Sequence, residues 1–122
     1  MSDPRHLLGR RAEEVTAAWL SASGWTILAR RWRRREGELD LVCRDPDGVL
    51  VAVEVKVRSG PRAGQPVESV DRRRIRRLRA ALGSYASSER VPTPMGLRID
   101  LVAVTPADMS WRLARHASID AW

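Results

Sequence analysis

Residues 37–58 read GELDLVCRDPDGVLVAVEVKVR and carry the strongest structural signal in the chain. Apolar and polar residues alternate over 38–44 and again over 49–58, which is the two-residue period of strands with one buried face. The segment between them reads Asp-Pro-Asp-Gly, with proline and glycine where a type I turn prefers them. These residues therefore predict a hairpin of two antiparallel strands.

The length of the turn determines which residues of the hairpin face each other. A three-residue loop made of 46–48, with its glycine in the left-handed conformation, pairs Asp45 with Val49. Counting along both strands, this register places Asp40 opposite Glu54. Two carboxylates in opposed positions repel each other, and a divalent cation with oxygen ligands would offset that repulsion.

The polar face of the same hairpin also has a simpler interpretation. The register places Glu38 opposite Lys56, so this face can be a hydrated surface on which these two residues form an ion pair. A single Glu-X-Lys, here residues 54–56, is common in proteins and indicates little by itself. Asp40 on the neighbouring strand strengthens the signal for a metal site, and both interpretations stay open from the residues alone.

Helices are predicted on both sides of the hairpin. Asp3 and Pro4 suit the cap and the first position of a helix that Gly24 can end. The apolar residues at helical spacing in this helix, its predicted buried stripe, are Leu8, Ala12, Val15 and Trp19. In a second helix, predicted over about 67–87, the stripe is Ile75, Leu78, Leu82 and Tyr85.

Further strands complete the predicted sheet. They are expected at 25–32, at 97–104 and, as a short edge strand, within 111–122. In the first of them Trp25, Ile27 and Ala29 share one side, and a basic loop follows over 33–37; Pro106 ends the strand at 97–104. The order αβββαβ predicts one α/β domain over 1–122, with a mixed four- to five-stranded sheet flanked by helices.

Charge and composition restrict the class of protein. The chain has 122 residues, with 22 Lys and Arg against 15 Asp and Glu, and a net charge of +7. A small basic domain commonly binds nucleic acid, although a general preference for arginine on the surface gives the same composition. The single cysteine, Cys43, excludes an internal disulfide framework and a multi-cysteine zinc site. With no membrane-spanning run and no secretion signal, a cytoplasmic protein is expected.

Two segments together resemble the YraN family of bacterial proteins, namely Gly37-Glu38-Leu39-Asp40-Leu41-Val42 and Val53-Glu54-Val55-Lys56-Val57-Arg58. Further similarity at 9–13, 64–70 and 119–122 extends the resemblance over nearly the whole chain. The family is placed in the restriction-endonuclease-like superfamily, whose motif is PD-(D/E)xK and whose members include Holliday junction resolvases and RecB-type nuclease domains. Leu39 stands where that motif has Pro, and Ala12, Val57 and Arg74 stand where the family commonly has Gly, Thr and Lys.

The resemblance implies a restriction-endonuclease-like core and a metal site within it. Asp40 and Glu54 would be carboxylate ligands of Mg²⁺ or Mn²⁺, and the backbone carbonyl of Val55 would be a further ligand. Lys56 would position or activate the attacking water, or stabilise charge on the phosphate.

Two more acids are candidates for the same site. By resemblance, Glu13 of the first helix would complete the acidic cluster, and Glu38 would assist or pair with Lys56. A surface position beside Arg10 explains Glu13 equally well, because such helical pairs are common.

Arginines near the acidic site are expected to bind phosphates of the substrate, since such contacts give affinity without sequence preference. The candidates are Arg30, Arg31, Arg33, Arg34, Arg35, Arg58, Arg62, Arg73, Arg74 and Arg77. On the second helix a hydrated face is an equal alternative. Trp32, beside the first run, is a candidate for stacking on a base.

These residues predict a Mg²⁺- or Mn²⁺-dependent nuclease that hydrolyses DNA phosphodiester bonds, with branched or repair intermediates as substrates by analogy with relatives. The alternative is a catalytically inactive nucleic-acid-binding domain of the same fold. A third class is a protein-interaction module whose basic helix binds an acidic partner. No membrane partner is expected, and a homodimer is expected only because related junction-cutting enzymes are dimers.

Overall fold

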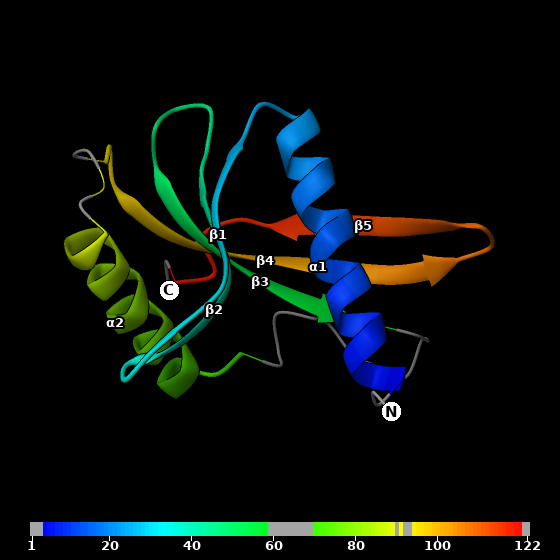
Figure 1. Ribbon diagram of the computed structural model, residues 1–122, viewed down its shortest axis with the longest axis horizontal. Coiled ribbons are helices and arrows are strands. Elements are labelled where there is room, and N and C mark those ends of the chain that lie inside the picture. Colours follow the sequence, from blue (N-terminus) through cyan, green and yellow to red (C-terminus); the bar gives the residue numbers. More distant parts are fainter. Residues whose placement is uncertain (1–3, 59–69, 90, 92–93, 121–122) are drawn as a thin grey trace.

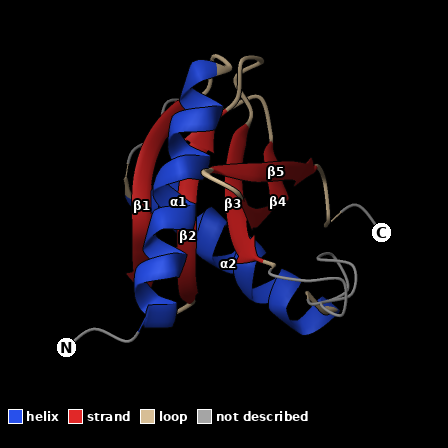
Figure 2. Cartoon of the chain, turned by 90° about the vertical axis from the view of Figure 1, so that its right-hand side faces the viewer, coloured by secondary structure: helices blue, strands red, loops and turns tan. Residues whose placement is uncertain are grey.

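The protein is an α/β domain in which a helix lies on each face of one mixed sheet. A computed structural model describes residues 4–58, 70–89, 91 and 94–120. The described elements are α1 (Pro4–Ala22), β1 (Thr26–Arg34), β2 (Gly37–Arg44), β3 (Leu50–Val57), α2 (Arg72–Ser88), β4 (Leu97–Ala107) and β5 (Ser110–His116). Figure 2 shows α1 in front of the sheet and α2 behind it. The predicted α/β class and the order αβββαβ are confirmed, with β5 added at the end.

The strands lie side by side in the order of the sequence, β1-β2-β3-β4-β5. Of the described strands, only β3 and β4 are parallel neighbours, because α2 connects them across one face of the sheet (Figure 1). Side chains of β3 alternate between the two faces. Val51 and Val53 pack under α1, on what we call the α1 face, while Leu50 and Ala52 pack under α2, on the α2 face. Neither helix in the described part of the chain has the length and apolar character needed to cross a membrane.

The β2–β3 hairpin has the predicted register. Leu41 pairs with Val53, and the Gly48 N–H donates to the Asp45 carbonyl at 3.0 Å within the turn. Gly48 has a φ of 89°, the left-handed conformation that a three-residue hairpin loop requires at its last position. The prediction succeeds here because the turn chemistry and the strand alternation specify the same register.

Helix α1 begins and ends as predicted, and Ala12 of the predicted stripe is buried, but Trp19 was assigned to the buried side incorrectly. Trp19 is 37% exposed, and Leu20 is buried in its place. Ala12 and Ala17 are also buried, so small side chains bring the helix close to the sheet, and the bulky indole is turned aside. Thr16 is buried too, and its hydroxyl donates to the Ala12 carbonyl at 2.7 Å, which satisfies the polar atom.

Three predicted boundaries are wrong. β1 continues to Arg34, so the basic residues form a tight hairpin turn rather than a loop over 33–37. α2 begins at Arg72, where Asp71 caps it, instead of near residue 67; residues 59–69 lie outside the described part. Pro106 does not end β4, which continues to Ala107. A proline is tolerated there because the pairing of β4 with β3 ends at Val104, and no described strand pairs with that side of β4 beyond this residue.

Cys43 is buried in the core on the α1 face. Ala29 packs on the α2 face, so it does not share a side with Ile27 as expected; a register shift between these two residues separates them.

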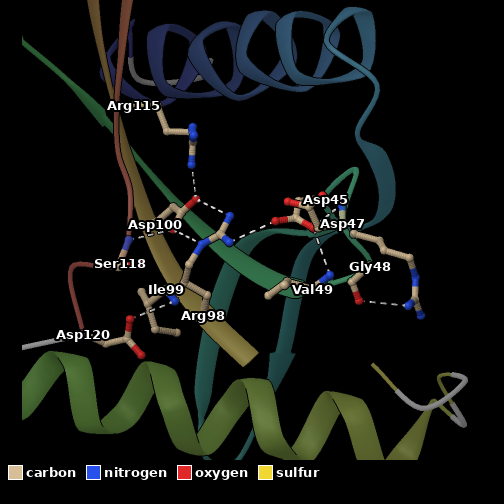
Figure 3. A network of polar contacts seen from close by, with 11 residues as sticks. Asp45, Asp47, Gly48, Val49, Arg98, Ile99, Asp100, Arg115, Ser118 and Asp120 are labelled. Carbon is tan, nitrogen blue, oxygen red and sulfur yellow. Dashed lines mark hydrogen bonds and ion pairs between the residues drawn. The ribbon is translucent and has the colours of Figure 1, made fainter. Parts of the chain in front are cut away.

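A buried carboxylate near the start of β4 joins β4, β5 and the C-terminal segment (Figure 3). Asp100 is fully buried and accepts hydrogen bonds from Arg98 Nε at 2.8 Å, Arg115 Nη1 at 2.9 Å and the Ser118 N–H at 2.9 Å. Arg98 Nη1 also donates to Asp45 at 2.9 Å, which ties in the β2–β3 turn. Because both oxygens of Asp100 accept hydrogen bonds, we interpret this network as one that stabilises the fold rather than one that binds a ligand.

Candidate functional site

Strand β2 changes face at Asp40. Leu41 packs on the α1 face and Leu39 on the α2 face, although residues two apart in a regular strand share one face. β1 is distorted at the same level. Its register with β2 places Arg31 opposite Asp40, and Arg31 has a φ of 48°. Left-handed residues other than glycine are uncommon, and they cluster at functional sites.

The distortion lets the Asp40 side chain take the place of a strand carbonyl. Regular pairing of β2 with β3 runs only as far as Leu41 and Val53. One residue further, Asp40 Oδ2 accepts a hydrogen bond from the Val55 N–H at 2.9 Å. The Asp40 carboxyl group also shares a hydrogen bond with the carboxyl group of Glu54, which raises its pKa. Asp40 is therefore held between two strands, with Oδ2 fixed by a backbone N–H and the side chain against a second acid.

Glu54 is buried next to Asp40, and its two oxygens differ in their hydrogen bonding. Its side chain is 1% exposed, and Oε2 receives Arg74 Nε at 3.0 Å and Arg74 Nη2 at 2.5 Å. Its other oxygen, Oε1, is buried without a hydrogen-bond partner in the described part of the chain. An unsatisfied buried oxygen is costly, and it indicates a place for a ligand, an ion or water.

The electrostatics show how close these acids are. Burial raises the pKa of Asp40 to about 8, and the charge of Glu54 adds to the effect, although the Val55 N–H opposes it. Burial also raises the pKa of Glu13, while Arg31 lowers it and Glu38 and Glu54 raise it again. Four acids from α1, β2 and β3 thus influence one another electrostatically, namely Glu13, Glu38, Asp40 and Glu54.

We expect the metal-free protein to lose stability as the pH rises from about 4 to about 8. Because the pKa of Asp40 is raised from 3.8 to about 8, the folded state holds a proton that the unfolded state releases in this range. The stabilisation from this proton is complete below the pKa of Asp40 in the unfolded state, and it is lost as the pH rises through the pKa of Asp40 in the folded state. Urea unfolding at pH 5 and pH 8.5 in EDTA measures it.

The matched variant for this measurement is Asp40→Asn, which has no proton to release at this position. Its free energy of unfolding should change less between the two pH values than that of the wild type. Equal pH dependence in the two proteins would show that Asp40 titrates normally.

The donor set suits a hard divalent cation. Within the described residues, no three Asp, Glu, His or Cys side chains are grouped closely enough to hold a metal ion. Mg²⁺ does not require three, since it commonly binds one or two carboxylates and keeps several waters. The groups that would hold such an ion are Asp40 Oδ1, Glu54 Oε1 and the backbone carbonyl of Val55.

Lys56 lies on β3 two residues after Glu54, and so by strand alternation on the same, α2, face. It is half-buried and forms no ion pair with a described residue. The ion pair expected between Lys56 and Glu38 is wrong, because Glu38 pairs with Arg33 at 3.1 Å. Lys56 is thus left as a cation beside the buried acids.

The predicted phosphate-binding arginines fall into different environments. Those that are exposed are Arg30, Arg31, Arg33, Arg34, Arg35, Arg73 and Arg77. Arg58 is half-buried, and Arg62 lies outside the described residues. Arg74 is only partly exposed and contacts Glu54, a pairing that the sequence did not reveal. A cavity of about 140 Å³ lies beside this pair, lined by Gly37, Glu38, Arg74, Arg77 and Leu78.

Trp32 is not available for stacking on a base. Its side chain is buried against Tyr85, with ring centroids 5.4 Å apart in an edge-to-face arrangement, and its Nε1 donates to Glu89 at 3.2 Å. Arg34 covers the outer face of the ring at 4.7 Å. The indole therefore anchors the β1–β2 hairpin to α2.

Comparison with known proteins identifies relatives over most of the chain. Residues 12–104 match the family model described as "Uncharacterised protein family UPF0102". The chain is 44% identical over 106 residues to a UPF0102 protein of Anaeromyxobacter dehalogenans, covering 87% of this chain and 78% of that protein. It is 46% identical over 110 residues to one of Acidothermus cellulolyticus, with 82% of each covered. A UPF0102 protein of Clavibacter michiganensis is 45% identical over 98 residues, with 80% of each covered. The chain belongs to the UPF0102 family, the family that the YraN resemblance indicated.

Proposed function

We propose that this protein is a divalent-metal-dependent nuclease that hydrolyses phosphodiester bonds of DNA. The observation that carries the proposal is the adjoining pair of half-buried Asp40 and buried Glu54, in which one oxygen of each is held by an N–H donor and Glu54 Oε1 has no hydrogen-bond partner among the described residues. A structural acid is normally satisfied at both oxygens, as Asp100 is. Strain at Arg31, directly opposite Asp40, supports the same location.

Each residue of the site has a distinct task in this proposal. Asp40, Glu54 and the Val55 carbonyl hold Mg²⁺ or Mn²⁺, which when bound acts as a Lewis acid and lowers the pKa of water. Lys56 places a positive charge on the α2 face, where it orients the scissile phosphate. Glu13 adds negative charge to the field around the carboxylate pair.

In this proposal the exposed arginines bind the phosphate backbone of the substrate. The β1–β2 turn region bears Arg33 and Arg35, and the exposed face of α2 bears Arg73 and Arg77. Figure 1 shows this turn next to the α2 ribbon, so both groups of charge lie at one end of the molecule. Arg77 lines a cavity together with Arg74, the residue that contacts Glu54, and this supports a basic surface near the carboxylate pair. A phosphate backbone is the polyanion that such a surface binds.

A cleavage assay with purified protein tests the proposal. Supercoiled plasmid and a four-way DNA junction are incubated with Mg²⁺, Mn²⁺ or EDTA, and a matched RNA duplex is included. Metal-dependent cutting of DNA is the expected result. Salt-sensitive binding without cutting of any substrate would favour the catalytically inactive nucleic-acid-binding domain, for which the Arg74 contact on Glu54 is the supporting observation.

DNA affinity should depend steeply on salt, and the double variant R73Q/R77Q should weaken that dependence. Each lost phosphate contact reduces the slope of log K against log salt by about 1, so a decrease of about 2 is expected. Fluorescence anisotropy with labelled DNA between 50 and 200 mM salt measures the slope, in ranges where binding is reversible. The variant R11Q/R112Q removes the same charge from other exposed positions. Equal slopes for the two double variants would contradict a binding face on α2.

A further inference from the structure

Arg74 is fixed at both ends, and among the described residues it is the arginine of α2 that contacts Glu54. It is the third residue of the helix, and its backbone N–H donates to the Asp71 cap at 2.9 Å. Its guanidinium reaches the sheet and places Nε and Nη2 on the same oxygen of Glu54. The side chain is 39% exposed while that of Glu54 is 1% exposed, so Arg74 lies between the buried acid and solvent.

The contact decides which oxygen of Glu54 is free. Both guanidinium donors occupy Oε2, and Oε1 is left buried with no partner among the described residues. Asp40, next to Glu54, has its own Oδ2 occupied by the Val55 N–H. The proposed function assigns Glu54 Oε1 and the second oxygen of Asp40 to a cation, so Arg74 determines the orientation of one ligand.

Arg74 also changes the charge of the site. Asp40 and Glu54, when both are ionised, carry two negative charges, and the guanidinium offsets one of them. A divalent cation that binds Glu54 Oε1 must then share the carboxylate with a cation already on Oε2. At low effective dielectric, repulsion between two cations on one carboxylate exceeds what a single hydrogen bond contributes.

We propose that Arg74 is a positioning residue and internal counter-cation, which orients Glu54 and lowers the affinity of the Asp40–Glu54 pair for divalent cations. The inference rests on the proposed function, because it takes the carboxylate pair to be the cation site. It assigns Arg74 a role in metal binding rather than in direct contact with substrate phosphate. A site weakened in this way fills more readily when a negatively charged phosphate is also present, since the phosphate offsets the guanidinium charge.

Calorimetric titration of the full-length, metal-free protein with Mn²⁺ tests the role of Arg74. R74Q removes the charge and keeps an N–H donor for Glu54, whereas R74K keeps the charge. R76Q, at an exposed position two residues along the same helix, is the matched loss of charge away from the site. We expect R74Q to bind Mn²⁺ roughly tenfold more tightly than the wild type, and R74K and R76Q to stay within about twofold.

The outcomes separate this inference from the proposed function. Mn²⁺ binding by the wild type that R74Q leaves unchanged or weakens would overturn the charge role of Arg74 alone, as would an equal gain in R76Q. Absence of Mn²⁺ binding in the wild type and in R74Q would overturn the metal site itself. If R74Q is unfolded without metal, refolding is titrated with Mn²⁺; folding driven by Mn²⁺ supports the inference and failure to fold contradicts it.

Discussion

Replacing Asp40 with asparagine is expected to reduce metal-dependent DNA cleavage by about 10³-fold or more. The amide keeps the shape of the side chain and an oxygen that can accept from the Val55 N–H at the same place. It removes the negative charge that the proposed cation requires, and each tenfold loss in rate corresponds to about 1.4 kcal/mol of lost barrier lowering. Initial rates on plasmid DNA in Mn²⁺ measure the effect.

Two controls separate loss of chemistry from loss of fold. Asp47→Asn makes the same chemical change at an exposed turn position and should leave cleavage unaltered. The free energy of unfolding of Asp40→Asn above pH 8 should equal or exceed that of the wild type, because a carboxylate that is buried beside Glu54 destabilises the fold when ionised. An inactive but more stable variant supports the site. Full activity in Asp40→Asn would refute it.

The hairpin and its register could be predicted from sequence because every signal is local. The turn residues, the two-residue alternation and the glycine at φ 89° all lie within residues 37–58. Leu41 and Val53 pair as predicted, and this pairing brings Asp40 near Glu54. The proximity of Asp40 and Glu54 therefore follows from local sequence signals alone.

The remaining features depend on tertiary contacts, and sequence patterns do not record them. Asp40 does not pair in the regular ladder, because β2 changes face there and its carboxylate takes the Val55 N–H. The contact of Arg74 with Glu54 joins residues 20 apart through the position of α2 on the sheet. Arg74 was predicted as a phosphate-binding residue or as part of a hydrated helix face, because nothing in the spacing of residues along the sequence shows which face of the sheet α2 covers.

The error at Trp19 has a related cause. Helical spacing identifies several apolar stripes, and the choice between neighbouring ones depends on what the helix packs against. In α1 the small residues Ala12 and Ala17 face the sheet, while Trp19 is partly exposed. Size complementarity with the strands below, rather than hydrophobicity alone, selected the buried side.

A contrast between two buried acids explains why one is assigned to chemistry and the other to structure. Asp100 is 0% exposed and Glu54 is 1% exposed. Asp100 receives two arginines and a backbone N–H, which between them use both oxygens. Glu54 receives a single arginine on one oxygen. Equal burial with unequal satisfaction is the physical basis for placing the site at Glu54.

Replacing Asp100 with alanine is accordingly expected to reduce the free energy of unfolding by about 3–5 kcal/mol. The substitution leaves Arg98, which is 21% exposed, without its principal partner and releases Arg115 and the Ser118 N–H. Because Asp100 joins β4 to β5 and to the C-terminal segment, the loss falls on the whole domain. Urea denaturation followed by tryptophan fluorescence measures it, and Glu14→Ala at an exposed position of α1 should change the value by less than about 0.5 kcal/mol.

The outcome for Asp100→Ala also tests whether the Asp100 hydrogen-bond network stabilises the fold independently of the proposed metal site. Arg98 retains Asp45 at 2.9 Å, and both Arg98 and Arg115 lie over the ring of Trp25, at 5.8 and 5.2 Å. If these contacts satisfied the arginines, the loss of stability would stay below about 1 kcal/mol, and Asp100 would not be the centre of the network. A large loss of stability, with Mn²⁺ affinity unchanged in the protein that remains folded, is the result that distinguishes a structural carboxylate from a metal-binding one.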